Sequence, residues 1–247
     1  LLVSEHFHDA SQDLTGDGWH ANMNYNGFTR PVWGWTAPVG TEQPLLGLPV
    51  RRARRGGAST AATMREFAAV LPWSVTAAQW NLLGSHDTAR IRTLVDGRDM
   101  LEVAVGLLLT YPGTPMVFAG DEVGATGTTG EHARVTMPWD RPRDWDEATF
   151  ALYRELIALR RGSVALRRGT LRRWLTEDDV LAYVRETPEE RVLVVAARAP
   201  GAGAALPPVL ARGGMPEALR GSEPVRGADG TVHVPGAGPA LTVWRLP

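Results

Sequence analysis

The sequence contains no cysteine, and all 26 of its basic residues are arginines, so lysine is absent as well. The first absence excludes disulfides, thiolate nucleophiles and cysteine-ligated metals, and the second excludes a lysine nucleophile or Schiff base. Long apolar runs are also missing, because the longest, VAVGLLLT at residues 103–110, is far shorter than the roughly 20 residues of a membrane-spanning helix. We therefore expect a soluble protein with no membrane partner.

The charges of the chain nearly cancel. Its formal net charge at pH 7 is -1 over 247 residues, so no global field attracts nucleic acid or an anionic membrane, and we expect a neutral partner. With 44% apolar residues, the chain can fill a core. It begins at Leu1 with the pattern of a buried strand, which predicts further polypeptide upstream and leaves a signal peptide open. The compartment is thus undetermined, with the cytoplasm narrowly preferred to the exterior.

Strand and helix patterns alternate over the first two thirds of the chain. Short apolar runs typical of buried parallel strands occur at LLVS (1–4), ANMNY (21–25), WNLLGS (80–85) and PMVFAG (115–120). Helical periodicity occurs at TAATMREFAAVL (60–71), RDMLEVAVGLLLTY (98–111) and DEATFALYRELIALRRG (146–162), whereas VWGWTAP (32–38) has the composition of a loop. This alternation predicts an α/β fold.

The pattern changes near residue 166. From there, alternating or β-branched runs are separated by glycine, proline and acidic turns, which predicts an antiparallel β domain over residues 166–247. Residues 1–165 then form the α/β part. A (β/α)8 barrel needs eight strands, and only the four runs above are present. The α/β part is therefore either a small open sheet or the second half of a barrel whose first half is missing.

Titratable side chains follow three of these strands, in SEHFHD (4–9), SHDT (85–88) and GDE (120–122). Because the carboxyl ends of parallel strands meet at one face, we expect Glu5, Asp87 and Asp121 to converge on one rim. Taken singly, a carboxylate after a strand has the alternative role of capping the next helix, and for Asp121 we prefer that interpretation.

Four blocks of sequence resemble the α-amylase superfamily, glycoside hydrolase family 13, in the order in which the family has them. SEHFHDA (4–10) is similar to the family's E-x-W-x-D/N block after barrel strand five, and NLLGSHDTAR (81–90) to its N-x-x-x-S/N-H-D block after strand seven. DGWHANMNYNGFTRP (17–31) resembles the strand-six segment. GTPMVFAGDEVGATGTTGEHARVTMPWDR (113–141) resembles the strand-eight segment of neopullulanases, cyclomaltodextrinases and α-glucosidases.

This resemblance implies the second half of a TIM barrel, strands five to eight, followed by a small all-β sandwich. It also implies retaining cleavage of α-glucosidic bonds in short α-glucans such as maltooligosaccharides, pullulan or cyclodextrins, by two flanking carboxyl groups. By position, Glu5 matches the general acid/base, and Asp87 matches the carboxylate that binds sugar hydroxyls in the distorted ring. His86 would hydrogen-bond the same sugar.

The resemblance assigns substrate contacts to further residues. Phe7 stands where many members have tryptophan and would stack on the leaving-group side, and His8 of the same block is expected at the substrate. Arg134 matches the first of the family's paired arginines and is a candidate donor to a distal sugar. Trp33 either stacks on a sugar face or packs its loop onto the barrel, and the sequence leaves both open.

The family nucleophile, an Asp in a G-x-R-x-D block after strand four, has no counterpart in these 247 residues. The chain alone is therefore expected to be inactive, and the nucleophile is expected from the missing N-terminal half of the barrel, on the same or a separate chain. We expect no cofactor and no metal in this part, with room for a structural calcium ion in the upstream region. A homodimer also fits.

Two rival hypotheses remain. His6 and His8 form an H-x-H pattern that, with His86 and Asp87, would suit a metal-dependent hydrolase, which exhaustive chelation would inactivate. A non-catalytic glycan-binding member would keep the pocket and lack the upstream Asp. Within the enzyme hypothesis, the sequence does not separate hydrolysis from transglycosylation or isomerisation, nor α-1,4 from α-1,6 preference.

Overall fold

Four short parallel strands form the sheet of the first part of the computed structural model, which describes residues 1–44, 46, 51, 53–201 and 203–247. They are β1 (Val3–Ser4), β2 (Ala21–Asn22), β3 (Trp80–Leu82) and β4 (Thr114–Met116). β1 pairs with β2, β3 pairs with β4, and a parallel bridge from Met23 to Trp80 joins the two pairs. The strands therefore lie side by side in chain order, and each predicted run carries one.

Helices separate these strands and follow the last of them. They are α1 (Arg30–Thr36), α2 (Gly57–Ala69), α3 (Trp73–Thr76), α4 (Ile91–Leu94), α5 (Gly97–Thr110), α6 (Gly130–Ala133), α7 (Glu147–Gly162) and α8 (Val164–Arg168). Short 3-10 turns lie at Ser11–Asp13, Asp121–Val123 and Pro142–Asp144, and a π-helical turn lies at Tyr25–Thr29. The three helices predicted from periodicity correspond to α2, α5 and α7. Asp146 caps α7 by accepting from the backbone N–H groups of Ala148 and Thr149.

Helix α1 corrects the expectation of a loop at residues 32–38. Pro31 occupies the first turn, where its missing N–H costs nothing. The indole N–H of Trp33 donates to Leu83 O at 3.0 Å, and that of Trp35 donates to Asp178 O at 2.9 Å. Both rings are almost fully buried. Packing thus outweighs the weak helix propensity of a segment that contains valine, two tryptophans and Gly34.

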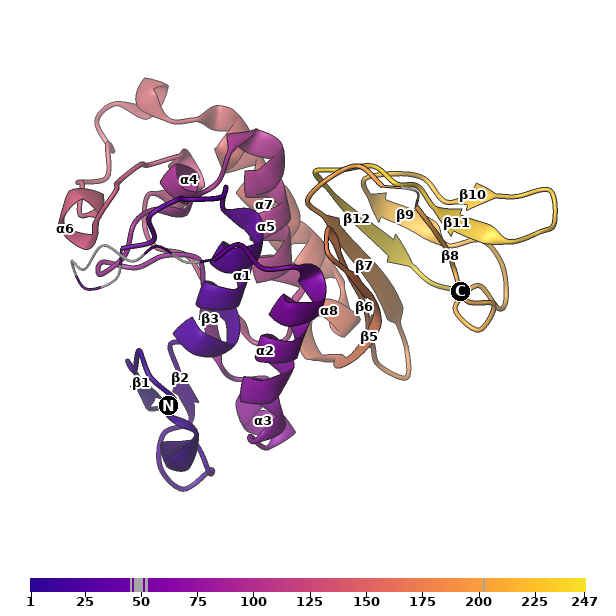
Figure 1. Cartoon of the computed structure of the whole chain (residues 1–247), viewed down its shortest axis with the longest axis horizontal. Helices are drawn as coiled ribbons and strands as arrows, with labels where there is room; N and C mark the ends of the chain where they lie inside the picture. The colour runs from indigo at the N-terminus through magenta and orange to yellow at the C-terminus, as the bar shows by residue number, and fades with distance from the viewer. Residues whose placement is uncertain (45, 47–50, 52, 202) are drawn as a thin grey trace.

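The second part is antiparallel. Its strands are β5 (Thr170–Glu177), β6 (Val180–Glu186), β7 (Arg191–Ala197), β8 (Ala204–Ala205), β9 (Glu217–Arg220), β10 (Val225–Arg226), β11 (Val232–Val234) and β12 (Ala240–Arg245). They form a five-stranded sheet in the order β5-β6-β7-β12-β9 and a three-stranded sheet in the order β10-β11-β8 (Figure 1). The antiparallel strand pairing predicted after residue 166 is confirmed.

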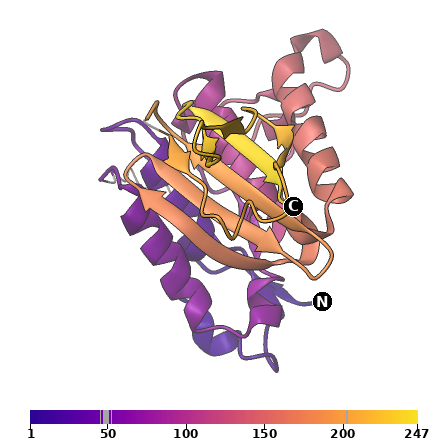
Figure 2. The same cartoon turned by 90° about the vertical axis from the view of Figure 1, so that its right-hand side faces the viewer.

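One hydrophobic core joins the two parts. It contains Leu107 and Leu108 of α5 together with Val194 of β7 and Leu241 of β12. Seen from the right of Figure 1, the five-stranded sheet lies across the helices (Figure 2). A Cβ at Gly106 would lie 2.5 Å from the Leu241 side chain, so helix and sheet are in close contact. A second core fills the space between the two antiparallel sheets.

Two buried arginines bind the carboxyl end of α5. Arg160 donates to the carbonyls of Leu109, Tyr111 and Gly113, and Arg185 donates to those of Thr110, Gly169 and Thr170. Burial lowers the pKa of Arg185 to about 10, which still leaves it charged at neutral pH.

Among the described residues, no helix combines the length and apolarity needed to cross a bilayer.

Candidate active site

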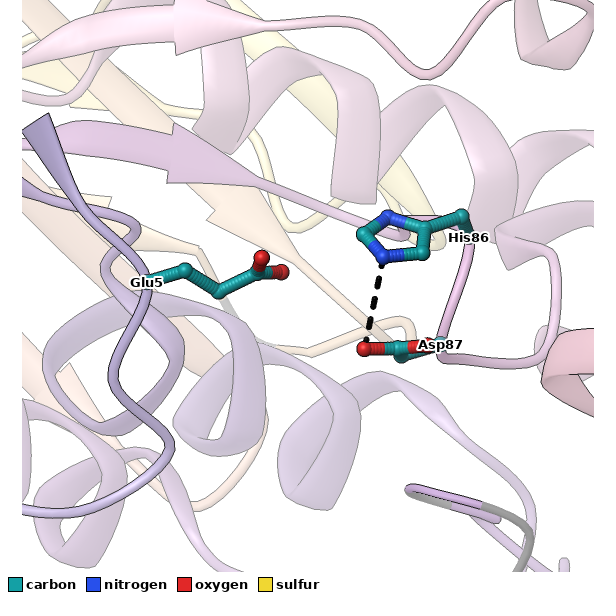
Figure 3. Close-up of side chains that lie close together, drawn as sticks. All are labelled: Glu5, His86 and Asp87. Carbon is teal, nitrogen blue, oxygen red and sulfur yellow. Dashed lines mark ion pairs between the residues drawn. The ribbon is translucent and has the colours of Figure 1, made fainter.

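Glu5 and the His86–Asp87 pair meet at one face of the parallel sheet. Glu5 directly follows β1, and His86 and Asp87 lie just beyond β3. One side-chain oxygen or nitrogen of each lies within 4.8 Å of those of the other two, and Figure 3 shows the three side chains pointing toward one another. The predicted convergence of strand ends therefore holds for these residues.

A buried tyrosine connects the two sides of the cluster. The hydroxyl of Tyr25, just after β2, lies 2.7 Å from Ser85 Oγ and 3.4 Å from Glu5 Oε1. Ser85 Oγ also accepts the backbone N–H of Asp87 at 3.2 Å. Burial raises the pKa of Tyr25 above its ordinary range, and the negative charges of Glu5 and Asp87 raise it further. The hydrogen bond with Ser85 lowers it, but by less. The phenol thus stays protonated as a donor.

The carboxylate of Asp87 is held from both sides. Arg134 Nη2 lies 3.0 Å from Asp87 Oδ1, and His86 Nε2 lies 3.5 Å from Asp87 Oδ2. Arg134 also donates through Nε to the carbonyl of His86 at 2.8 Å. The Asp87 side chain is 18% exposed, whereas those of His86 and Arg134 are about half exposed. The carboxylate is therefore oriented and still accessible to a small polar ligand.

Phe7 and His8 follow Glu5 closely in the chain, but the surroundings of the two rings differ from each other. The Phe7 ring stacks on Tyr25 with centroids 4.2 Å apart and packs against an apolar cluster that contains Met23 and Leu82. His8 is exposed, and its ring centroid lies 4.8 Å from that of His6. Phe7 thus packs on the tyrosine that supports the acid cluster, and contacts of Phe7 and His8 with substrate stay predictions.

Two expected residues are not part of this cluster. Trp33 is 1% exposed and hydrogen-bonded to Leu83 O, so it has no free ring face for a sugar, and the sugar-stacking hypothesis for it is corrected in favour of packing. Asp121 is 2% exposed and pairs with Arg90 at 2.9 Å. It makes no side-chain capping bond, so neither the rim position nor the cap expected for it is found. Burial raises the pKa of Asp121 to about 6, with the Arg90 hydrogen bond opposing.

The residues that the sequence left unassigned are those that support the cluster. Tyr25 lies in the MNY segment and Ser85 in S-H-D, so both were inside quoted motifs without a role. Their signal was weak, because a hydroxyl's partner is set by tertiary contacts between different strand ends.

The H-x-H metal hypothesis finds no ligand set among the described residues. Their group with metal-like spacing contains Glu5, His86 and Asp87, and neither His6 nor His8 belongs to it. The Nδ1 atom of His6 is buried without a hydrogen-bond partner, and the ring lies outside the group that contains His86 and Asp87.

Comparison with known proteins gives the family. The family model described as "Alpha amylase, catalytic domain" matches residues 50–150. Neopullulanase 2 from Thermoactinomyces vulgaris is 32% identical over 198 residues, which is 79% of this chain and 31% of that protein. A cyclomaltodextrinase from a Bacillus species is 32% identical over 197 residues, which is 78% of this chain and 32% of that protein. The chain thus spans about a third of these curated relatives.

A solved structure extends the likeness to almost the whole chain. The native debranching enzyme from Nostoc punctiforme superposes on this chain with a TM-score of 0.81 at 26% identity. The superposition covers 98% of this chain and 51% of the debranching enzyme chain. The sequence blocks, the convergence of Glu5 with His86 and Asp87, and these matches agree with one another. The chain belongs to the α-amylase superfamily, glycoside hydrolase family 13.

Proposed function

We propose that this chain forms half of the active site of a retaining glycoside hydrolase that cleaves α-glucosidic bonds in short α-glucans. The observation that carries the proposal is the meeting of Glu5 with His86 and Asp87, whose polar atoms lie within 4.8 Å of one another although they follow different strands. The relatives are named for neopullulanase and cyclomaltodextrinase activity, which supports pullulan, cyclodextrins and maltooligosaccharides as substrates.

Glu5 acts as the general acid/base in this proposal. It protonates the leaving glycosidic oxygen and later removes a proton from the incoming water, while its partner carboxylate forms the covalent glycosyl intermediate. The Tyr25 hydroxyl, 3.4 Å from Glu5 Oε1, restricts where that carboxyl group points.

Asp87 and His86 bind the sugar whose bond is broken. Carboxylate and imidazole groups accept or donate to hydroxyls, and contacts to a negative carboxylate strengthen as positive charge develops on the ring. Arg134 and His86 flank the two Asp87 oxygens, so the carboxylate meets the sugar in a fixed orientation. Phe7 provides an apolar face next to Glu5 for the leaving-group side.

The nucleophile comes from polypeptide outside these 247 residues. β1 and β4 each pair with one strand among the described residues, which leaves two sheet edges for further parallel strands. We therefore propose that residues 1–165 are the second half of a (β/α)8 barrel, completed by a half that carries an Asp after its fourth strand, and that residues 166–247 form a β-sandwich domain.

The test uses the full-length protein that contains this chain. Reducing ends released from maltotriose, pullulan and cyclodextrin are measured for the wild type, for Glu5→Gln and for Glu66→Gln, a matched change at an exposed glutamate of α2. Glu5→Gln should lose about 10³-fold or more in kcat with an unchanged fold. Near-normal turnover refutes the assignment, binding without cleavage by the wild type supports a glycan-binding protein, and inactivation by chelators that calcium ions do not reverse supports the metal hypothesis.

A further inference from the structure

Arg90 follows Asp87 closely in the chain and is buried, with 1% of its surface exposed. Its guanidinium donates twice to Ala133 O, through Nε at 3.0 Å and Nη2 at 2.8 Å, and once to Ala119 O at 2.8 Å. The same group pairs with Asp121 Oδ1 at 2.9 Å. One side chain thus joins two separate stretches of the chain, at Ala133 and at Ala119–Asp121.

The carbonyl of Ala133 connects this buried arginine to the candidate site, because the next residue is Arg134. Arg134 donates to His86 O at 2.8 Å and to Asp87 Oδ1 at 3.0 Å. A Cβ at Gly130 would lie 3.0 Å from both Asp87 Cα and His86 O, so the backbone of α6 lies directly against the pair. The position of α6 therefore determines that of the Asp87 carboxylate.

We infer that Arg90, paired with Asp121, is a positioning residue for Asp87. It fixes segment 125–134, which holds Asp87 through Arg134 and through the backbone contact at Gly130. This inference rests on the proposed function, in which Asp87 binds the reacting sugar. It assigns Arg134 to the alignment of Asp87 in place of the expected contact with a distal sugar.

The contacts explain why position 90 needs an arginine. Its planar fork places two nitrogens on one carbonyl and a third on Ala119 and Asp121, a span that the single ammonium of lysine does not reach. Asp121 compensates the buried positive charge, and removal of one partner would leave the other charge unpaired in the interior. The Arg90–Asp121 pair is therefore a rigid anchor and not an exposed, screened contact.

Arg160 provides a matched control. It is also a buried arginine that donates to backbone carbonyls, those of Leu109, Tyr111 and Gly113 at the end of α5. None of these groups belongs to segment 125–134. Replacement of either arginine by lysine should lower the melting temperature, but only the change at Arg90 should disturb Asp87.

The experiment compares Arg90→Lys, Arg134→Gln, the double variant and Arg160→Lys in the full-length protein, each assayed well below its melting temperature. We expect kcat to fall about 10- to 100-fold in each of the first two, with a smaller change of KM, as for a catalytic group displaced by a fraction of an ångström to an ångström. The double variant should fall no further than Arg134→Gln, because both act on one carboxylate. Arg160→Lys should keep kcat within about twofold, since its contacts are remote from the site.

Equal losses of kcat in Arg90→Lys and Arg160→Lys, or losses at Arg90 and Arg134 that multiply in the double variant, would overturn the inference. If Arg90→Lys does not fold, Asp121→Asn replaces it, because it removes the carboxylate that pairs with the Arg90 guanidinium. If the wild type cleaves no α-glucan, the proposed function fails, and the inference is read from the labelled ring resonances of His86. These must shift in Arg90→Lys and Arg134→Gln and stay in place in Arg160→Lys; any other pattern overturns it.

Discussion

Replacement of Ser85 by alanine tests the hydrogen-bonded support beneath the two carboxylates. Ser85 is 1% exposed, and its Oγ is bonded to the Tyr25 hydroxyl at 2.7 Å and accepts the Asp87 N–H at 3.2 Å. The alanine variant removes the partner of both groups and adds no bulk. Tyr25 still has Glu5 Oε1 at 3.4 Å as a weaker acceptor, whereas the Asp87 N–H loses the acceptor that the structure gives it.

The expected cost follows from these two groups. A buried polar group that loses its partner costs about 1–3 kcal/mol, and with partial compensation of Tyr25 by Glu5 we expect about 2–4 kcal/mol in all. That corresponds to a lowering of the melting temperature by about 4 °C or more for a chain of this size. Turnover should fall about tenfold or more, because the backbone at Asp87 is no longer fixed. Differential scanning fluorimetry and initial rates on full-length protein measure both.

A double variant decides between a specific hydrogen bond and a general loss of packing. Removal of both hydroxyls in Tyr25→Phe with Ser85→Ala should be less destabilising than the sum of the single changes, because no phenol is left unpaired. Additive costs, or a Ser85→Ala protein that melts and turns over like the wild type, would refute the reasoning.

The buried carboxyl of Asp121 should make stability depend on pH. Its pKa of about 6 in the fold exceeds the ordinary 3.8, so the folded state binds this proton more tightly than the unfolded chain, and the free energy of unfolding should fall as pH rises from about 4 to about 6. Asp121→Asn should remove that part of the slope in urea titrations, and an unchanged slope would contradict it. Trp33→Leu should lower the free energy of unfolding by about 2–4 kcal/mol and leave KM unchanged. Phe7→Leu should raise KM for the α-glucan that the wild type cleaves and change the melting temperature only slightly. Arg185→Met should lower the melting temperature and leave kcat within about twofold, because its contacts join α5 to β5 and β6.

Periodicity located the framework of the α/β part because buried strands and amphipathic helices leave long patterns. The runs at 98–111 and 146–162 became α5 (Gly97–Thr110) and α7 (Glu147–Gly162) with shifts of one residue. Helix α1 escaped detection, since a seven-residue segment with a proline and a central glycine carries almost no helical period. Its two indole N–H bonds reach Leu83 and Asp178, which lie far away in the chain, so only the folded molecule shows why it is helical.

The site was predictable where strand topology alone brings residues together. Glu5 and Asp87 follow strands of one parallel sheet, and the structure places them side by side, while their roles stay predictions. Asp121 also follows a strand, but its side chain is buried against Arg90. Whether such a side chain lies at the rim or in the interior depends on a partner elsewhere in the sequence. The sequence likewise left open whether Trp33 is exposed or packed, and the structure buries it.

The core shared by α5 and the five-stranded sheet has a consequence for any attempt to trim the protein. Division of the chain near residue 165 would expose Leu107 and Leu108 on one fragment and Val194 and Leu241 on the other. Both fragments would carry large apolar faces, which favours aggregation over independent folding. The β-rich part therefore contributes to the same core as the α/β part, and unfolding of one should carry the other with it in a single cooperative transition.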